Sequence, residues 1–592
     1  MKMTLATIVA SAAVGTLASG ALAAEILVTS DITTSTTWTS NNVYNLQGQI
    51  YVTPGATLTI QPGTILASTT NIGGSLSVCR GARIIAIGTQ ENPIVFTSKA
   101  DVATWTAGNP KTGTWRAACN EWGALTLMGA AYISENAVAT NTAAPNAANY
   151  AVMEGLVSSG AGDTRVLYGG GNDDDNSGTL SYCTFRYGGK VIGLANELNG
   201  LSMGGCGRET HVDHMEIMNN VDDGIEVWGG TVDFKYCSIW NIGDDCFDID
   251  QGWRGRAQFM LLVAGYSQDA AQGSGVTDNG IEMDGAEQSD YQPVTAGCIY
   301  NATVIGNPGT NASGSNGSDQ ATAWRDNCNM QIRQSVFMQW GEMLVKNDNV
   351  DGDGGAGYGF NGTLTFAQRW ATPSSFLLGT DAANKNAPAS PVNFYKSQLA
   401  GNLCEIYDSV AYDFPNTTAV TIATIAGPTN YNQADQVGFS NAAMHNVKAT
   451  TLPIASITRG RNVLLQTGLL GVKPVTKLDP RAANDAVTAF STAPNNGFFT
   501  PVTYRGAFSS TDNWLCNWSA SDAFGFLAYP AGFTCSIVQP CPADLNGDGV
   551  VNASDLAGLL GGWGTTNGDV NGSGSTDAAD LAALLGAWGN CP

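Results

Sequence analysis

Short segments in which apolar and polar residues alternate recur along the first hundred residues. Three of them are "QIYV" at 49–52, "ATLTI" at 56–60 and "RIIAI" at 83–87, separated by Pro-Gly or Gly-rich turns. A period of two residues is that of a β-strand with one buried face. Short strands joined by tight turns are typical of stacked coils that share one continuous core. The pattern predicts a mostly β protein whose main part, over 25–537, is a right-handed parallel β-helix.

An internal repeat supports this architecture. The segment from Val212 to Val227 aligns with the one that ends at Ile249, with an offset of 22 residues (245 − 223). Four polar pairs then coincide: Asn219 with Asn241, Asp222 with Asp244, Asp223 with Asp245, and Glu226 with Asp248. We expect each pair to stack on adjacent coils, with Glu226 and Asp248 outside the core and Asp284 extending the acidic line. The residues expected inside the core are Ile225, Val227, Phe247 and Ile249.

Composition narrows the class of protein. Charged residues make up only 13% of the 592 residues, and there are 72 glycines, against roughly 25% charged residues in average globular proteins. The 50 acidic residues outnumber the 26 basic ones, which gives a net charge of −24. Nucleic acids and anionic lipids need Lys and Arg to neutralise their phosphates, so neither is an expected partner. An acidic balance is compatible with an exported protein that binds Ca²⁺.

The first residues have the features of an export signal. Lys2 is followed by a stretch of Ala, Val, Leu and small residues, and Ala21-Leu22-Ala23 gives a small-x-small cleavage pattern. We expect residues 1–24 to be a signal peptide and the mature protein to be secreted or displayed on the cell surface. No later stretch reaches the roughly 18 apolar residues of a spanning helix, so we expect no membrane span in the mature chain.

The 13 cysteines all follow this signal. Export makes disulfides plausible, but spacing does not assign the pairs. An odd number leaves at least one thiol free or shared between chains.

Two segments near the C-terminus have the spacing of EF-hand calcium loops. Oxygen-bearing residues occupy loop positions 1, 3, 5, 9 and 12, glycine occupies position 6, and position 7 offers a backbone carbonyl. The first loop supplies Asp544, Asn546, Asp548, Val550, Asn552 and Asp555. The second, 25 residues on (569 − 544), supplies Asp569, Asn571, Ser573, Ser575, Asp577 and Asp580. The spacing predicts two Ca²⁺ sites.

Each loop leads into a short apolar helix, "DLAGLLGGWG" from Asp555 and "DLAALLGAWG" from Asp580. Asp stands at position 12, and no full helix precedes either loop. In these features residues 541–592 resemble a dockerin module, which implies a small α-helical calcium module that docks onto a cohesin-like partner. Partner choice in that family depends on loop positions 10 and 11, which are small residues here and leave the partner open. Cys541 and Cys591 bracket the module, and we predict a disulfide between them.

The larger region also resembles a known family. The segments "GTQENPIVFTS", "NELNGLSMGGCG", "DDGIEVWGGTVDFKYCSIWNIGDDCFDID" and "YRGAF" are similar to those of exported bacterial β-helix proteins of unassigned function. The similarity covers most of residues 25–530. It implies a surface or secreted β-helix and no known reaction.

The acid pairs allow three interpretations. Gly243-Asp244-Asp245-Cys246 resembles the acid-pair motif of polygalacturonases, whose acids protonate the leaving oxygen and activate water. Asp223, Asp244 and Asp245 are then the candidate catalytic residues. The Gly-His-Gly and Arg-Ile-Lys segments of that family are absent.

A second interpretation is a calcium site like that of pectate lyases, formed by Asp222, Asp223, Asp244, Asp245 and Asp248. Lyase chemistry would also need a base, for which Arg254 and Arg256 are the candidates. In the third, Asp and Asn cap the turns between coils by accepting hydrogen bonds from backbone amides. This reading can coexist with bound calcium.

Other candidate groups fit structural roles better. His211 and His214 lie three residues apart, so on a regular strand they face opposite sides and make a poor metal pair. Trp228, Trp240 and Trp253 could form a platform for sugar stacking, but we expect them to pack in the core.

The sequence therefore favours a secreted or surface β-helix with a calcium-binding C-terminal module. Its expected role is structural, adhesive or carbohydrate-contacting within a surface assembly. The alternative is a polysaccharide-degrading enzyme, either a glycoside hydrolase or a lyase, targeted by its dockerin-like module. Whether the protein is an enzyme stays open at this point.

Overall fold

The protein is described by a computed structural model. The structure describes residues 24–134, 149–160, 162–193, 196–267, 275–286, 293–308, 318–341, 343–347, 364–375, 395–414, 438–461, 463, 472–536, 541, 543–545, 550–565, 568–570 and 575–590. The predicted signal peptide lies almost entirely outside these residues.

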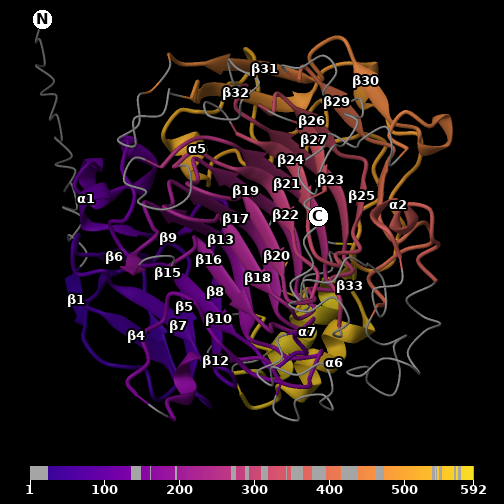
Figure 1. Ribbon diagram of the computed structural model, residues 1–592. Helices are drawn as coiled ribbons and strands as arrows, with labels where there is room; N and C mark the ends of the chain where they lie inside the picture. Colours follow the sequence, from indigo (N-terminus) through magenta and orange to yellow (C-terminus); the bar gives the residue numbers. More distant parts are fainter. Residues whose placement is uncertain are drawn as a thin grey trace, which may run out of the picture.

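Two long parallel sheets form most of the described structure (Figure 1). Sheet 1 holds 17 strands: β1 (Ala24–Val28), β2 (Thr36–Trp38), β3 (Asn42–Leu46), β5 (Thr57–Ile60), β6 (Ile65–Ser68), β8 (Arg83–Ile87), β9 (Ile94–Ser98), β13 (Gly178–Arg186), β17 (His211–Met218), β19 (Asp233–Trp240), β21 (Arg256–Val263), β23 (Cys298–Ile305), β25 (Gln331–Arg333), β26 (Val336–Met338), β28 (Glu405–Tyr407), β29 (Val410–Tyr412) and β30 (Val447–Ala449). Sheet 2 holds nine: β4 (Gln49–Val52), β7 (Ser75–Val78), β10 (Leu125–Met128), β16 (Leu201–Gly204), β18 (Ile225–Trp228), β20 (Phe247–Asp250), β22 (Asn279–Met283), β24 (Gln320–Trp324) and β27 (Met343–Asn347).

The structure also contains smaller elements outside these two sheets. Four antiparallel pairs join β11 (Ala151–Val152) to β12 (Leu167–Tyr168), β14 (Val191–Gly193) to β15 (Asn196–Glu197), β31 (Ile454–Arg459) to β32 (Val475–Ala482), and β33 (Val550–Val551) to β34 (Gly589–Asn590). The helices are α1 (Lys99–Val102), α2 (Phe366–Arg369), α5 (Ala520–Ala523), α6 (Ala553–Gly561) and α7 (Ala578–Gly586). Short 3-10 turns are η1 (Thr106–Gly108), η2 (Pro110–Thr112), η3 (Thr164–Val166), η6 (Ala442–Met444) and η7 (Asp485–Val487).

From β13 to β24 the chain alternates between the two sheets, so each of these coils adds one strand to each. In other coils two short strands, such as β8 and β9, take the place of one long strand of sheet 1. β17 and β19 pair in parallel, and so do β18 and β20. In sheet 2 the residues at one register position are Leu201, Ile225, Phe247 and Ile281, all fully buried. The predicted repeat of 22 residues and the predicted inward residues are therefore confirmed. Apolar rows of this kind give a solenoid its stability, because every coil covers the core of its neighbour.

One corner of the β-helix is stabilised by a stack of side-chain rings from adjacent coils. Tyr182, His214, Tyr236 and Phe259 all have a positive φ, between 41° and 59°. Their rings stack at centroid distances of 4.3, 4.5 and 4.8 Å. The left-handed residue interrupts the strand alternation, and His211 and His214 both hydrogen-bond Asp213, at 2.5 and 2.6 Å. The expectation that the two histidines face opposite sides was wrong for this reason.

Helices α6 and α7 pack against each other and form a small separate core around Val551, Leu559 and Leu584. Each helix begins with a capping box, made by Asn552 with Asp555 and by Asp577 with Asp580. Reciprocal bonds of this kind satisfy two otherwise unpaired backbone amides at each helix start. The predicted short helices therefore form where the repeat places them.

The cysteines divide into two groups. Nine are free thiols buried in the fold, while Cys516 and Cys535 form a disulfide. Cys541 is also disulfide-bonded, but Cys591 lies outside the described residues, and its pairing with Cys541 stays a prediction. Most cysteines thus serve as small apolar core residues.

Within the described part of the chain, we found no helix with the length and apolar character that membrane spanning requires.

Candidate metal centre

The strand register brings acids from adjacent coils onto one face of sheet 2. Glu226 on β18 lies directly beside Asp248 on β20, and Asp248 lies beside Glu282 on β22. The predicted stacking of the acid pairs is confirmed. Glu282, rather than Asp284, continues this row, and Asp284 lies two residues further along. We call the following eight residues the acid cluster: Asp222, Asp223, Glu226, Asp244, Asp245, Asp248, Glu282 and Asp284.

Part of the acid cluster caps the turns that lead into sheet 2. The Asn199 Oδ1 accepts a hydrogen bond from the Asp223 amide at 3.1 Å, and the Asp223 Oδ1 accepts one from the Asp245 amide at 2.8 Å. The Asp245 Oδ1 in turn accepts a hydrogen bond from the Asn279 amide at 2.6 Å. One side-chain oxygen on each coil therefore binds the backbone of the next coil. The turn-capping interpretation is correct for this row.

The remaining carboxylate oxygens converge in two groups that share Asp223. One oxygen each from Asp222, Asp223 and Asp244 lie within 4.8 Å of one another, and so do oxygens from Asp223, Glu226 and Asp248. Carboxylate oxygens at such spacing can be ligands of a hard cation, which Ca²⁺ contacts at about 2.3–2.6 Å. Asp223 and Glu226 are only 6% and 8% exposed, so water provides little screening.

Burial and mutual repulsion hold protons on these groups. Burial, followed by the charges of Glu154 and Glu197, raises the pKa of Asp222 to about 7. Burial and neighbouring carboxylates raise the pKa values of Asp223, Glu226 and Asp248 well above the usual range. Like charges this close ionise together only at a large cost in free energy. The cluster must therefore hold protons or a cation.

Two oxygen atoms beside these groups are suited to a cation. The Oδ1 atoms of Asp248 and Asn279 are buried and accept no hydrogen bond within the described structure. Asn279 is 5% exposed, and its Nδ2 donates to Glu282 at 3.0 Å. A buried acceptor without a partner costs about 1–3 kcal/mol. A bound cation would remove that cost, so the donor set fits Ca²⁺.

The sequence analysis missed the main basic group of this face. Arg325, just beyond β24, forms ion pairs with Glu282 and Asp284. Burial raises the pKa of Glu282, but the Asp245 hydrogen bond and the Arg325 charge outweigh it and hold that pKa below its usual value. No motif marks Arg325 in the sequence, because the coil between β22 and β24 is longer than 22 residues.

The features expected of a catalytic groove are only partly present. Arg254 is fully buried and pairs with Asp173 at 2.6 Å, and Arg256 pairs with Asp233. Neither predicted lyase base is available for proton abstraction. Trp228, Trp240 and Trp253 are 6%, 0% and 0% exposed, so they are packing residues and not a sugar platform.

The terminal calcium loops are described only in part. Asn546, Asp548, Asn571 and Ser573 lie outside the described residues, as do several neighbours. In the described part, Asp555 and Asp580 are fully buried, and the Asp555 Oδ1 accepts a hydrogen bond from the Leu545 amide at 2.8 Å. The last carboxylate of the first loop thus turns back over the loop start. Calcium binding by both loops stays a prediction.

Comparison with known proteins gives one match. A family model described as a pectate-lyase-like β-helix domain matches residues 30–368, more than half of the chain. No curated protein and no solved structure matches the sequence. The matched range contains the whole acid cluster.

Proposed function

This chain belongs to the family of pectate-lyase-like β-helix domains, and on that premise we propose that it is an exported calcium-binding protein that contacts acidic polysaccharide. The observation that carries the proposal is the convergence of two carboxylate triads at Asp223. With a net charge of −24, the protein repels a polyanion. Bound Ca²⁺ would remove that repulsion locally and could share its remaining ligand positions with sugar carboxylates.

Binding without cleavage is favoured by the surroundings of the cluster. An inverting hydrolase needs its two carboxyl groups roughly 6.5–9.5 Å apart to admit water, whereas one oxygen from each triad member lies within 4.8 Å of the others. Asp223 and Asp245 also use one oxygen each for the backbone of the next coil. One oxygen of each acid therefore accepts a backbone hydrogen bond, and the other oxygen of Asp223 is left to bind a cation.

The test is affinity electrophoresis of the full chain in gels that contain pectate, with calcium and with chelator. We expect calcium to increase the retardation, and Asp223→Asn to remove that increase. Asp485→Asn, which neutralises an exposed acid on η7, is the matched control. Retardation that is equal with calcium and in chelator would contradict the proposal.

The alternative, polysaccharide cleavage, is supported by the raised pKa of Asp222, which lies in the range of a general acid. The same samples answer it, by following reducing ends and unsaturated products. Product formation that depends on Asp223, Asp244 or Asp245, with folding intact, would make the cluster a catalytic site.

We further propose that 541–592 is a dockerin-like module that binds two Ca²⁺ ions and docks onto a cohesin-like partner. Its support is a pair of equivalent exposed apolar side chains on each repeat. Leu560 and Trp563 follow one loop, Leu585 and Trp588 follow the other, and each is about half exposed. Exposed Leu and Trp at repeated positions are unusual unless a partner covers them. Capture by a cohesin-type domain that fails in Trp563→Ala/Trp588→Ala would support this, and undiminished capture would refute it.

A further inference from the structure

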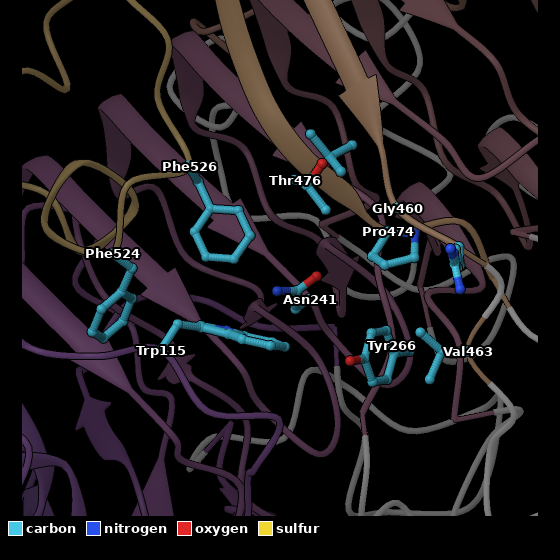
Figure 2. A pocket seen from close by; sticks show the side chains of 11 residues that line it. Trp115, Asn241, Tyr266, Gly460, Val463, Pro474, Thr476, Phe524 and Phe526 are labelled. Atoms are coloured by element: carbon cyan, nitrogen blue, oxygen red, sulfur yellow. The ribbon is translucent and has the colours of Figure 1, made fainter.

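A second candidate site is a cavity whose lining contains none of the acid cluster residues. A cavity of about 410 Å³ opens between the turn after β19, the β31–β32 hairpin and the segment after α5. Its lining includes four aromatic side chains, from Trp115, Tyr266, Phe524 and Phe526. Figure 2 shows Trp115, Phe524 and Phe526 on one side, Tyr266 across from them, and Asn241 between. Such a volume lies within the range of roughly 300–1,000 Å³ for small-molecule sites.

Asn219 fixes two of the lining residues. Its Oδ1 accepts hydrogen bonds from the Trp115 Nε1 at 3.1 Å and from the Asn241 Nδ2 at 3.2 Å. Its Nδ2 donates to the carbonyls of Arg116 and Ala118, both at 2.9 Å. The indole of Trp115 and the amide of Asn241 are therefore held in place before any ligand arrives.

The orientation of Asn241 leaves its Oδ1 as an acceptor at the cavity. Among the described residues no hydrogen bond is donated to this atom, although Asn241 is only 4% exposed. The next coil carries Gly265 near this atom, where a Cβ would lie 2.0 Å from the Asn241 Oδ1. The absence of a side chain at Gly265 thus makes room for the amide oxygen of Asn241.

The lining groups match the surface of an acidic sugar. Half-buried aromatic rings can pack against the C–H face of a pyranose, and a buried amide oxygen can accept a bond from a hydroxyl group. Arg461 is exposed at the cavity and forms no ion pair within the described structure. A guanidinium group can bind a carboxylate through two parallel hydrogen bonds.

We propose that this cavity binds one uronate residue of a polysaccharide, with the ring against Trp115, a hydroxyl on Asn241 and the carboxylate on Arg461. The site needs no metal, and it does not depend on the calcium proposal. Together with the acid cluster it would give the chain a second contact to one polysaccharide, through a different chemistry.

The test is calorimetric titration of the full chain with oligogalacturonate and with a neutral xylo-oligosaccharide, both in chelator. We expect oligogalacturonate to bind and Arg461→Ala to weaken that binding about tenfold or more, the effect of losing a charge-assisted hydrogen bond. Trp115→Ala should abolish it. Lys473→Ala removes a neighbouring exposed cation that does not line the cavity and should change nothing.

Asp223→Asn should also bind oligogalacturonate normally in chelator, which separates this site from the acid cluster. No binding by the wild type, equal binding of the neutral sugar, or binding that survives both Arg461→Ala and Trp115→Ala would overturn the proposal. Gly265→Ala gives an independent check, because its methyl group would crowd the Asn241 oxygen and should weaken binding while Trp115 and Arg461 remain.

Discussion

Replacing Asp223 by asparagine should stabilise the protein in chelator and destabilise it in calcium. The amide keeps the shape of the side chain and the oxygen that accepts the Asp245 amide bond at 2.8 Å. It removes the one charge that both carboxylate triads share. Structural and electrostatic roles of Asp223 are therefore separated by a single substitution.

The magnitude follows from the spacing. Two unit charges within 4.8 Å of each other repel by at least about 3.5 kcal/mol at an effective dielectric constant of about 20. In the wild type, protonation of some carboxylates limits the summed repulsion within the acid cluster. Near pH 8 we therefore expect Asp223→Asn to gain about 3 kcal/mol of unfolding free energy in chelator. Near pH 4 the gain should vanish, because the neighbouring acids hold protons.

Calcium should reverse the sign of the stability difference between Asp223→Asn and the wild type. A cation that binds only the folded protein adds about 4.1 kcal/mol when its free concentration is about 1,000 times its Kd, which exceeds the roughly 3 kcal/mol gained by relieving the repulsion. The wild type gains this free energy, and Asp223→Asn loses it. Urea denaturation followed by circular dichroism, in chelator and in millimolar calcium, measures both differences, with Asp485→Asn as control. An asparagine variant that is less stable than wild type under both conditions would refute the reasoning.

Three further outcomes follow from the structure. In chelator the melting temperature of the wild type should fall as pH rises from about 4 to about 7. The pKa of Asp222 is raised from 3.8 to about 7, so in this window the folded state binds more protons than the unfolded state. A melting temperature that rises across this window would contradict the raised pKa. Ile249→Ala should cost about 2–5 kcal/mol in urea denaturation, because Ile249 is fully buried in the core row of sheet 2 and a cavity would remain; a loss below about 0.5 kcal/mol would mean that the row is loosely packed. Arg505→Met should cost about 3–5 kcal/mol of unfolding free energy, because it leaves Asp408 buried without the guanidinium that contacts it at 2.6 and 2.8 Å. Adding Asp408→Asn to this variant should restore part of the lost stability.

The repeat could be predicted from the sequence because its period is visible in the residues themselves. An asparagine, a pair of aspartates and an alternating apolar strand recur 22 residues apart, so Glu226 had to lie beside Asp248 once the coils stacked. The next coil broke the period. Glu282 takes the position expected of an acid, but 34 residues separate it from Asp248 (282 − 248). Without the period as a guide, the sequence analysis chose Asp284, two residues further along.

Contacts between distant segments were not predictable in this way. Arg325 reaches the acid cluster from another coil, and Trp115 meets Asn219 across 104 residues. The corner residues were also missed. A left-handed conformation at His214 is unusual for a non-glycine residue, and it is stabilised here by rings stacked above and below, which a single strand does not reveal.

We infer that the β-helix itself binds calcium, apart from the terminal loops. The most direct measurement is the number of calcium ions retained after equilibrium dialysis by a full-length variant with Asp544→Ala and Asp569→Ala, which disable both loops. We predict that calcium is still retained and that adding Asp223→Asn removes it. A loop-disabled protein that retains no calcium, while still folded by circular dichroism, would mean that the acid cluster does not bind calcium.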